Sequence, residues 1–206
     1  IRTHPVERRA VEAEVRMVGR IDVDETRLKD VTAWVPGRLE RLYVDYTGIR
    51  VQAGDHMVDL YSPELYAAQE VLLQLLRDRA RAADRAASGA RALDGKLDAT
   101  IETARERLRL LGLTPAQVAE IEQRGTASYH VTIYAPMSGV VMEKQAQQGA
   151  YVDTGTRIYT LADLARLWVR LEADERDLPW LRYGQKVAFE TQALPGEEFT
   201  GTIAFI

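Results

Sequence analysis

An internal repeat limits what this chain can fold into more than any other feature of its sequence. In the first copy, Gly37 is followed at offsets of 11, 14, 17 and 23 residues by Gly48, Val51, Gly54 and Leu60. In the second copy, Gly139 is followed at offsets of 10, 13, 16 and 22 residues by Gly149, Val152, Gly155 and Leu161. One additional residue in the first loop explains every difference, so the spacing favours a duplicated structural unit over coincidence.

Each copy of the repeat has the pattern of short strands separated by tight turns. Runs such as residues 39–44 alternate apolar and polar side chains, which is typical of half-buried strands. The repeated glycines fall between these runs, where a turn needs positive φ or close backbone approach. We therefore expect two four-strand halves, residues 31–62 and 128–163, to pair into one small flattened sandwich.

Between the two copies, the apolar period changes from strand-like to helical. Ser62-Pro63-Glu64 supplies a capping hydroxyl, a proline at the first helical position and an acid in the first turn. Small and apolar residues then recur at alternating spacings of three and four, on both sides of a break at Ala87-Ser88-Gly89. The pattern predicts a slender hairpin of two antiparallel helices, each about 35 Å long at 1.5 Å per residue. The predicted seam positions are Leu65, Ala68, Leu72, Leu75, Arg79, Ala82 and Ala86, then Leu93, Leu97, Thr100, Ala104, Leu108 and Leu111.

A third, shorter helix is predicted after the hairpin. Gly112 ends the second helix, Thr114 is placed as the next N-cap, and Pro115 takes the first helical position. Gln117 completes a capping box, and Gly125 is a normal C-terminal glycine. The helical insertion is therefore expected to span residues 63–127.

Alternating segments outside the repeat predict a further β module. We expect a partial β-barrel built from residues 8–30 and 164–206, because the chain stops at Phe205-Ile206 within a strand-like run. Residues 177–181 are expected to form one helical turn. The alternating segments are residues 15–23, 167–173, 187–190 and 199–203.

Composition excludes several classes of function. The net charge of −4 argues against general nucleic-acid binding, which needs a clustered basic surface. No apolar stretch approaches the roughly 20 residues that span a bilayer, and the absence of a signal peptide before Ile1 predicts a mature or trimmed fragment. Cysteine is absent, and three histidines accompany no nucleophile or phosphate-loop motif. We therefore predict no enzymatic activity and no cofactor.

Potential metal ligands are scattered along the chain. A soft cation needs several convergent donors, and isolated methionines are usually core filler. Only His56 and Met57 are close in sequence, and adjacent residues of a strand face opposite sides. No metal site is therefore predicted. The candidates considered are His4, His56, His130, Met17, Met57, Met137 and Met142.

The split repeat, the inserted hairpin and the flanking barrel together resemble the periplasmic adaptors, the HlyD-like membrane fusion proteins of bacterial export systems. Tyr61–Leu65 and Leu110–Thr114 look most like the heavy-metal branch, whose copper and silver adaptor is best known. The signatures cover nearly the whole chain. They imply a mostly β fold with an α-helical hairpin, in which the hairpin splits a lipoyl-like barrel-sandwich hybrid and a partial β-barrel follows. They are Val51-x-x-Gly54, Leu60–Leu65, Ala68-Gln69-Glu70, Ala135-Pro136-x-x-Gly139-Val140-Val141, Gly149-x-x-Val152-x-x-Gly155, Leu164-x-x-Leu167-Trp168-Val169, Gly184-Gln185-x-Val187, Pro195-Gly196 and Phe199-x-Gly201-x-Ile203.

This resemblance implies a role at the inner membrane of a Gram-negative bacterium. Such adaptors link an inner-membrane RND-type exporter to an outer-membrane TolC-like channel, and several copies form a sealed periplasmic conduit. The implied cargo is a heavy-metal cation. Copper-branch adaptors bind metal through methionines near the mature N-terminus, and this chain has none before Met17. Any capture of the cation is therefore expected in segments outside this chain.

The resemblance also implies a channel-binding tip. Family hairpins often carry an Arg-x₃-Leu-x₆-Ser signature, which appears here as Arg77-x₃-Arg81-x₆-Ser88 with arginine in place of leucine. We expect Arg77, Arg81, Arg85 and Ser88 to contact the channel. An ordinary solvated helix face is the alternative.

Two other functions fit parts of the pattern. An adaptor for drugs or secreted proteins would share the fold and the partners but carry a different cargo. A biotinyl or lipoyl carrier repeats the same half-motif, but it needs a modified lysine on a tight hairpin between the halves. Here residues 62–128 occupy that place, and Lys144 lies inside the second half.

Overall fold

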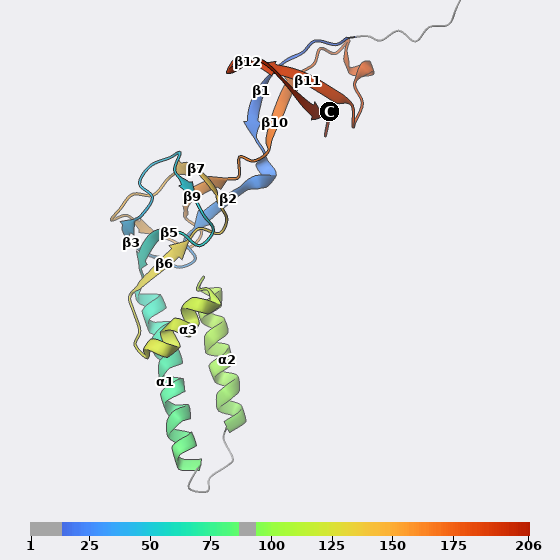
Figure 1. The fold of residues 1–206 in the computed structure, drawn as a ribbon. Coiled ribbons are helices and arrows are strands. Elements are labelled where there is room, and N and C mark those ends of the chain that lie inside the picture. The colour runs from blue at the N-terminus through green and yellow to red at the C-terminus, as the bar shows by residue number, and fades with distance from the viewer. Residues whose placement is uncertain (1–13, 87–93) are drawn as a thin grey trace, which may run out of the picture. The chain divides into compact units, whose positions relative to one another are not determined.

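The computed structural model describes residues 14–86 and 94–206, and the chain divides into two compact units (Figure 1). The larger unit spans Val23–Arg166. The smaller unit combines Leu167–Ile206 with the N-terminal residues up to Asp22. The larger unit thus holds both copies of the repeat and the helical insertion, and the smaller holds segments that the sequence assigned to the barrel.

In the described part of the larger unit, the repeat forms two four-stranded sheets. One sheet has the strand order β6-β5-β3-β8, and the other has the order β2-β9-β7-β4. A one-turn 3₁₀ helix, η1 (Glu25–Arg27), precedes β2. The strands are β2 (Leu28–Thr32), β3 (Gly37–Leu42), β4 (Arg50–Val51) and β5 (His56–Tyr61) before the helices, and β6 (His130–Tyr134), β7 (Gly139–Lys144), β8 (Tyr151–Val152) and β9 (Arg157–Ala162) after them.

The two sheets are related by exchange of the two copies. Replacing each strand by its repeat equivalent (β2 with β6, β3 with β7, β4 with β8, β5 with β9) converts one strand order into the other. Each sheet therefore takes strands from both copies, and neither copy can bury its apolar face alone. The predicted sandwich of two paired half-motifs is confirmed.

Backbone hydrogen bonds between the copies show the same reciprocity. Each bond has a counterpart in which donor and acceptor are replaced by their repeat equivalents. The turn glycines match as well, with φ of 86° at both Gly48 and Gly149, and of 90° and 87° at Gly54 and Gly155. The bonds run from Gly48 N to Val141 O (2.8 Å), Gly149 N to Leu39 O (2.7 Å), Gly54 N to Ala135 O (2.9 Å) and Gly155 N to Ala33 O (2.7 Å).

The core of the sandwich lies between the sheets. Repeat-equivalent residues such as Leu60 and Leu161 are both buried. Tyr159 is fully buried, and its hydroxyl donates to the Val44 carbonyl oxygen at 2.8 Å, which satisfies the phenol. Burial raises the pKa of Tyr159 to about 12.

Strand β2 begins earlier than the sequence suggested. Leu28 pairs with Ala162 of β9, so residues 28–30, which the sequence assigned to the barrel, hydrogen-bond within the sandwich. The physical reason is the edge of β9, whose backbone would otherwise lack a partner. The signal in the sequence is weak because Leu28, Lys29 and Asp30 are all exposed.

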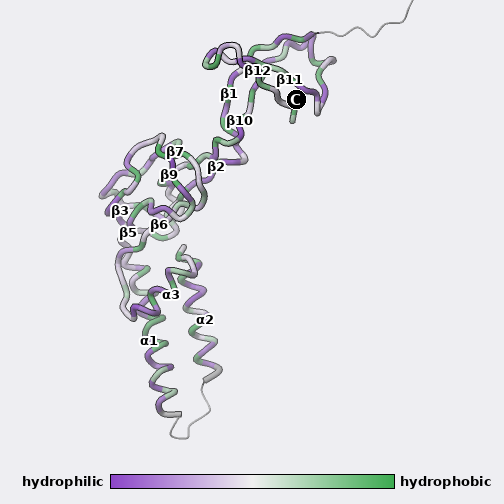
Figure 2. Tube along the Cα trace, viewed as in Figure 1, coloured by the Kyte–Doolittle hydropathy of each residue, from purple (hydrophilic) through white to green (hydrophobic). Residues whose placement is uncertain are grey.

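The insertion contains the predicted hairpin, α1 (Pro63–Ala86) and α2 (Asp94–Leu110), which lie side by side (Figure 1). Ser62 caps α1, since its hydroxyl accepts from Leu65 N at 3.4 Å. Hydrophobic and hydrophilic residues alternate along both helices, as expected for a seam with a solvated outer face (Figure 2). No helix among the described residues combines the length and apolar character needed to cross a membrane.

Among the described seam positions, the structure differs from the prediction at two. The predicted seam residue Leu93 and the side chain of Ala86 lie outside the described residues. Thr100 is exposed and Ile101 is only 1% exposed, so Ile101 takes the place predicted for Thr100. The reason is the order of the three- and four-residue steps, which run from Leu97 to Ile101 and then to Ala104. At Arg79 the seam is replaced by an interhelical ion pair, in which Arg79 Nε lies 3.1 Å from Asp98 Oδ1.

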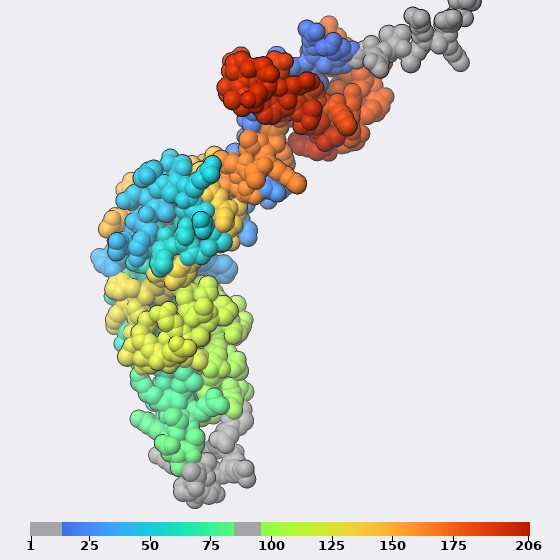
Figure 3. All heavy atoms as spheres, in the orientation of Figure 1, coloured from blue at the N-terminus to red at the C-terminus, as the bar shows by residue number. Residues whose placement is uncertain are grey.

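The short helix α3 (Pro115–Arg124) forms as predicted, with the Thr114–Gln117 capping box present and Gly125 left-handed at its end. It crosses the sandwich-proximal part of the hairpin on the face shown in Figure 3. Arg105 of α2 binds both carboxylate oxygens of Glu122, at 2.6 and 2.8 Å. These charged hydrogen bonds fix α3 against α2.

The smaller unit consists of two strand pairs. β1 (Val18–Val23) pairs with β10 (Leu167–Glu172), and β11 (Lys186–Thr191) pairs with β12 (Leu194–Thr202). The predicted helical turn is present as η2 (Leu178–Trp180). The described strands do not close a barrel, so the expectation of a partial barrel is confirmed.

Candidate partner-binding site

The arginines predicted to meet a partner lie on α1, where a spacing of four residues places them on one face. The Arg77 guanidinium donates to the carbonyl oxygen of Gly125, at the end of α3, at 3.4 Å. Arg81 pairs with Asp78 at 3.5 Å, and the side chain of Arg81 is 66% exposed while that of Asp78 is about half exposed. Because an exposed pair contributes only about 0–1 kcal/mol, Arg81 can leave Asp78 for a partner at little cost.

Arg85 belongs to α1 by its backbone, and its side chain lies outside the described residues, as does Ser88. The structure therefore brings Arg77 and Arg81 to the same helix face, with Arg77 engaged by α3 and Arg81 exposed. Their contact with a channel stays a prediction.

The solvent face of the sheet β6-β5-β3-β8 holds both histidines of the described part of the chain. His56 lies between the rings of Tyr43 and Tyr134, at centroid distances of 5.5 and 5.1 Å. His130 Nε2 lies 2.6 Å from Glu40 Oε2. The His130 ring also lies 5.7 Å from that of Tyr61, so both histidines contact tyrosine rings and His130 additionally contacts a carboxylate.

On this face, the neighbours of Glu40 change the pKa of its carboxylate. The Arg38 guanidinium donates to Glu40 Oε1 at 2.5 Å. This bond, together with that from His130, holds the pKa of Glu40 below its ordinary value of 4.5, and partial burial opposes the shift. The carboxylate therefore stabilises the fold in its charged form.

Replacing Glu40 with glutamine is expected to lower the melting temperature more at pH 7 than at pH 3. Because the pKa is lower in the folded chain, the stabilisation is present above the unfolded value near 4.5 and is lost as the pH falls through the folded pKa. Thermal unfolding at both pH values measures the difference. In an Arg38→Met background the difference should shrink, since the largest cause of the shift is gone. An equal decrease at both pH values would contradict the assignment.

The candidate metal ligands that the structure describes lie in different surroundings. Met57 is fully buried in the core while its neighbour His56 is exposed, as adjacent strand residues should be. Met142 is 38% exposed and Met17 belongs to the smaller unit. Across residues 14–86 and 94–206, no three His, Cys, Asp or Glu side chains are placed to hold a metal ion. His4 lies outside the described residues.

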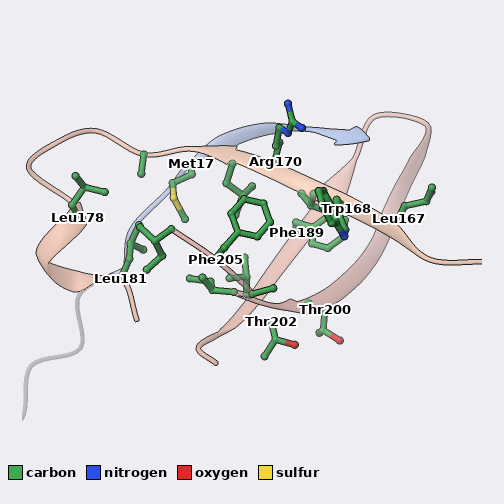
Figure 4. A pocket seen from close by; sticks show the side chains of 18 residues that line it. Met17, Leu167, Trp168, Arg170, Leu178, Leu181, Phe189, Thr200, Thr202 and Phe205 are labelled. Carbon is green, nitrogen blue, oxygen red and sulfur yellow. The ribbon is translucent and has the colours of Figure 1, made fainter. Parts of the chain in front are cut away.

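A hollow of about 500 Å³ lies in the smaller unit, between its two strand pairs. Figure 4 shows Met17, Phe189 and Phe205 around this space, with Leu178 and Leu181 at one end. The lining is mostly apolar, as the inside of a barrel should be. It holds no constellation of polar groups that could fix a ligand's orientation.

The structural role of Gln69, which the sequence presented only within the signature Ala68-Gln69-Glu70, was not predicted. Gln69 is fully buried, and its amide makes two hydrogen bonds with the backbone of Ser128, just before β6. A polar residue beside the apolar seam position Ala68 was the available signal. Its partner, 59 residues away, could not be inferred from the helical pattern.

Two family models match the chain in sequence order. The model described as the CusB barrel-sandwich hybrid domain matches residues 28–162, and the CusB-like β-barrel domain matches residues 166–206. The first match includes β2 from its first residue and ends with β9. The boundary between the two matches lies close to the boundary between the compact units.

Curated relatives match over shorter segments. A UPF0194 membrane protein from Acidithiobacillus ferridurans is 35% identical over 74 residues, which is 36% of this chain and 22% of that protein. The UPF0194 membrane protein YbhG of Salmonella arizonae is 28% identical over 75 residues, 36% of this chain and 23% of that protein. The match thus spans less than a quarter of each relative.

Solved structures share the fold at low sequence identity. ZneB from Cupriavidus metallidurans has a TM-score of 0.54 at 22% identity, covering 91% of this chain and 81% of that one. A MacA–MexA chimera containing the Pseudomonas aeruginosa MexA α-hairpin domain has a TM-score of 0.62 at 20% identity, covering 90% and 63%. Because the family model covers more than half of the chain, the chain belongs to the CusB-like family of membrane fusion proteins, the periplasmic adaptors.

Proposed function

We propose that this chain is the core of an adaptor that links an inner-membrane RND-type exporter to an outer-membrane TolC-like channel. The observation that carries the proposal is a two-fold sandwich with a helical hairpin inserted between its halves, followed by a CusB-like β-barrel segment. In this role the protein supplies contacts and a conduit rather than catalysis. Self-association of several copies at the inner membrane of a Gram-negative cell belongs to the same proposal.

Heavy-metal cations are the cargo that the family match favours. The matching models are CusB and CusB-like, and the signatures Tyr61–Leu65 and Leu110–Thr114 resemble the heavy-metal branch. Export of drugs or proteins through the same architecture is the alternative. A strain lacking the gene distinguishes them, because loss of tolerance to copper, silver or zinc salts, with drug tolerance retained, supports metal cargo. The reverse pattern would overturn it.

The carrier alternative finds no support in the fold. A carrier needs an exposed lysine on a tight hairpin between the halves, and α1, α2 and α3 occupy that connection. Lys144 lies at the end of β7, is 25% exposed and faces Asp45 at 3.9 Å. Its position inside the second half is unlike that of an attachment site.

Reversing the charge of Arg81 is expected to weaken binding of the channel by about tenfold, because a charge pair at an interface contributes about 1.4 kcal/mol. Equilibrium binding of Arg81→Glu to the purified channel measures the change. Because the chain has no cysteine, a single photo-crosslinker attached to Arg81→Cys tests separately whether this position contacts the channel. Arg109→Glu on α2 is the matched control, since Arg109 is also exposed and pairs with Glu106. Equal binding by Arg81→Glu and the unsubstituted chain would count against a tip-docking role.

A further inference from the structure

The hairpin is attached to the sandwich on the α1 side by a buried amide. Gln69 Nε2 donates to the carbonyl oxygen of Ser128 at 3.0 Å, and Ser128 N donates to Gln69 Oε1 at 3.0 Å. Gln69 is 0% exposed, and both polar ends of its amide are hydrogen-bonded to the backbone of one residue, so no buried polar group is left unpaired there. This pair of hydrogen bonds resembles the pairing of two strands. It joins the second turn of α1 to the chain that enters β6.

Stacked rings reinforce the same connection. The rings of Tyr66 in α1 and Tyr129 before β6 lie 3.9 Å apart at an interplanar angle of 4°. Tyr129 also stacks on Tyr61 of β5, at 5.5 Å and 19°. The rings therefore form a continuous stack from the sheet to the first turn of α1, and such pairs contribute about 0.5–1.5 kcal/mol each beyond burial.

A separate contact attaches the α2 side. Gly112, after the end of α2, has φ of 91°, and a Cβ built there would lie 2.7 Å from both Cβ and Cγ of Trp34. This short distance means that Trp34, which precedes β3, packs directly on the backbone of the turn between α2 and α3. In addition, Gln117 Nε2 of α3 donates to the Thr132 carbonyl oxygen of β6 at 2.9 Å.

These contacts hold the two helices independently. One attachment would leave the helix pair free to pivot about it, whereas attachments on both helices oppose bending and twisting together. Farther along the hairpin, the ion pair between Arg79 and Asp98 joins the two helices to each other and not to the sandwich. The direction of the hairpin is therefore determined at its root.

We propose that Gln69, the Tyr66–Tyr129 stack and the Trp34–Gly112 contact form a root joint that sets the direction of the hairpin relative to the sandwich. They are positioning residues, since they act through the distant helix faces rather than by touching a partner. Their importance for docking rests on the proposed function. The joint itself is a property of this chain alone.

Spin-label distances test the joint directly. Because the chain has no cysteine, Arg81→Cys on the hairpin and Gln148→Cys on the sandwich give one defined pair of exposed labels. Double electron–electron resonance should give a narrow distance distribution in the otherwise unsubstituted chain. Tyr66→Leu and Gln69→Met should each broaden it about twofold, and Tyr66→Phe, which keeps the ring, should leave it narrow.

Folding is monitored separately by circular dichroism and melting temperature. If Gln69→Met fails to fold, Tyr66→Leu and Trp34→Ala carry the test, since Tyr66 is partly exposed and Trp34 is 60% exposed. Broadening without loss of helical signal supports the joint. A broad distribution in the unsubstituted chain, or an unchanged width in folded Tyr66→Leu and Trp34→Ala, would overturn it.

Binding of the purified channel separates this inference from the proposed function, and it is measured on the same substitutions in the cysteine-free chain, in which Arg81 is intact. Weaker binding by the broadened variants, with Tyr66→Phe unaffected, supports positioning for docking. Broadened variants that bind the channel normally would overturn that docking role. If the unsubstituted chain does not bind the channel although its width responds to the substitutions, the proposed function fails and the joint stands.

Discussion

Leu72→Asp is expected to unfold the hairpin at a cost of about 5 kcal/mol, which approaches the whole stability of a typical domain. Leu72 is 0% exposed in the seam, within the same core cluster as Ile101 and Leu108. Removing the leucine alone costs about 2–5 kcal/mol. The introduced carboxylate is then either buried without a partner or forces the helices apart. Urea denaturation followed by far-UV circular dichroism measures the loss.

Val71→Asp is the matched control for this substitution. It introduces the same carboxylate one residue away in α1, at a position that is 57% exposed. We expect a change of about 0.5 kcal/mol or less, because no buried group is altered. Equal losses from the two substitutions would contradict the seam assignment and mean that α1 packs in a different rotation.

The repeat, the hairpin and the third helix could be predicted from the sequence because each has a strong local signal. Glycine spacing reflects turns in which an ordinary side chain is strained, so Gly48 and Gly149 keep their places in both copies. Thr114 and Gln117 form a capping box whose partners are three residues apart. Such signals need no knowledge of distant contacts.

The remaining features depend on contacts that the local pattern does not contain. Residues 28–30 join the sandwich only because the edge of β9 needs a partner far along the chain. Ile101 replaces Thr100 because a heptad pattern leaves the order of its three- and four-residue steps open. Gln69 appeared in the sequence only as part of the signature Ala68-Gln69-Glu70, and its structural role depends on the backbone of Ser128. The candidate tip could be predicted only as a helix face, since its chemistry depends on a partner.

Gly37→Ala and Gly139→Ala are expected to destabilise the sandwich by about 3 kcal/mol each. A Cβ at Gly37 would lie 2.4 Å from the Tyr61 carbonyl oxygen, and a Cβ at Gly139 would lie 2.5 Å from that of Ala162. Both oxygens belong to the backbone of the paired strand and cannot rotate away, so the sheets must separate locally. Thermal and denaturant unfolding of the two variants should give equal losses, because the two clashes are equivalent under exchange of the copies.

The matched controls are Gly54→Ala and Gly155→Ala, where a Cβ would meet nothing within 4 Å. Positive φ at these positions costs an alanine about 1 kcal/mol, without any clash. The expected ranking is therefore two large, equal losses and two small, equal losses. If the losses in the free energy of unfolding caused by Gly37→Ala and Gly139→Ala differed by more than about 1 kcal/mol, the two copies would be equivalent in backbone structure but not in stability. The larger loss would then be expected at Gly37, because the strand that it contacts also holds Tyr61, whose ring stacks on Tyr129.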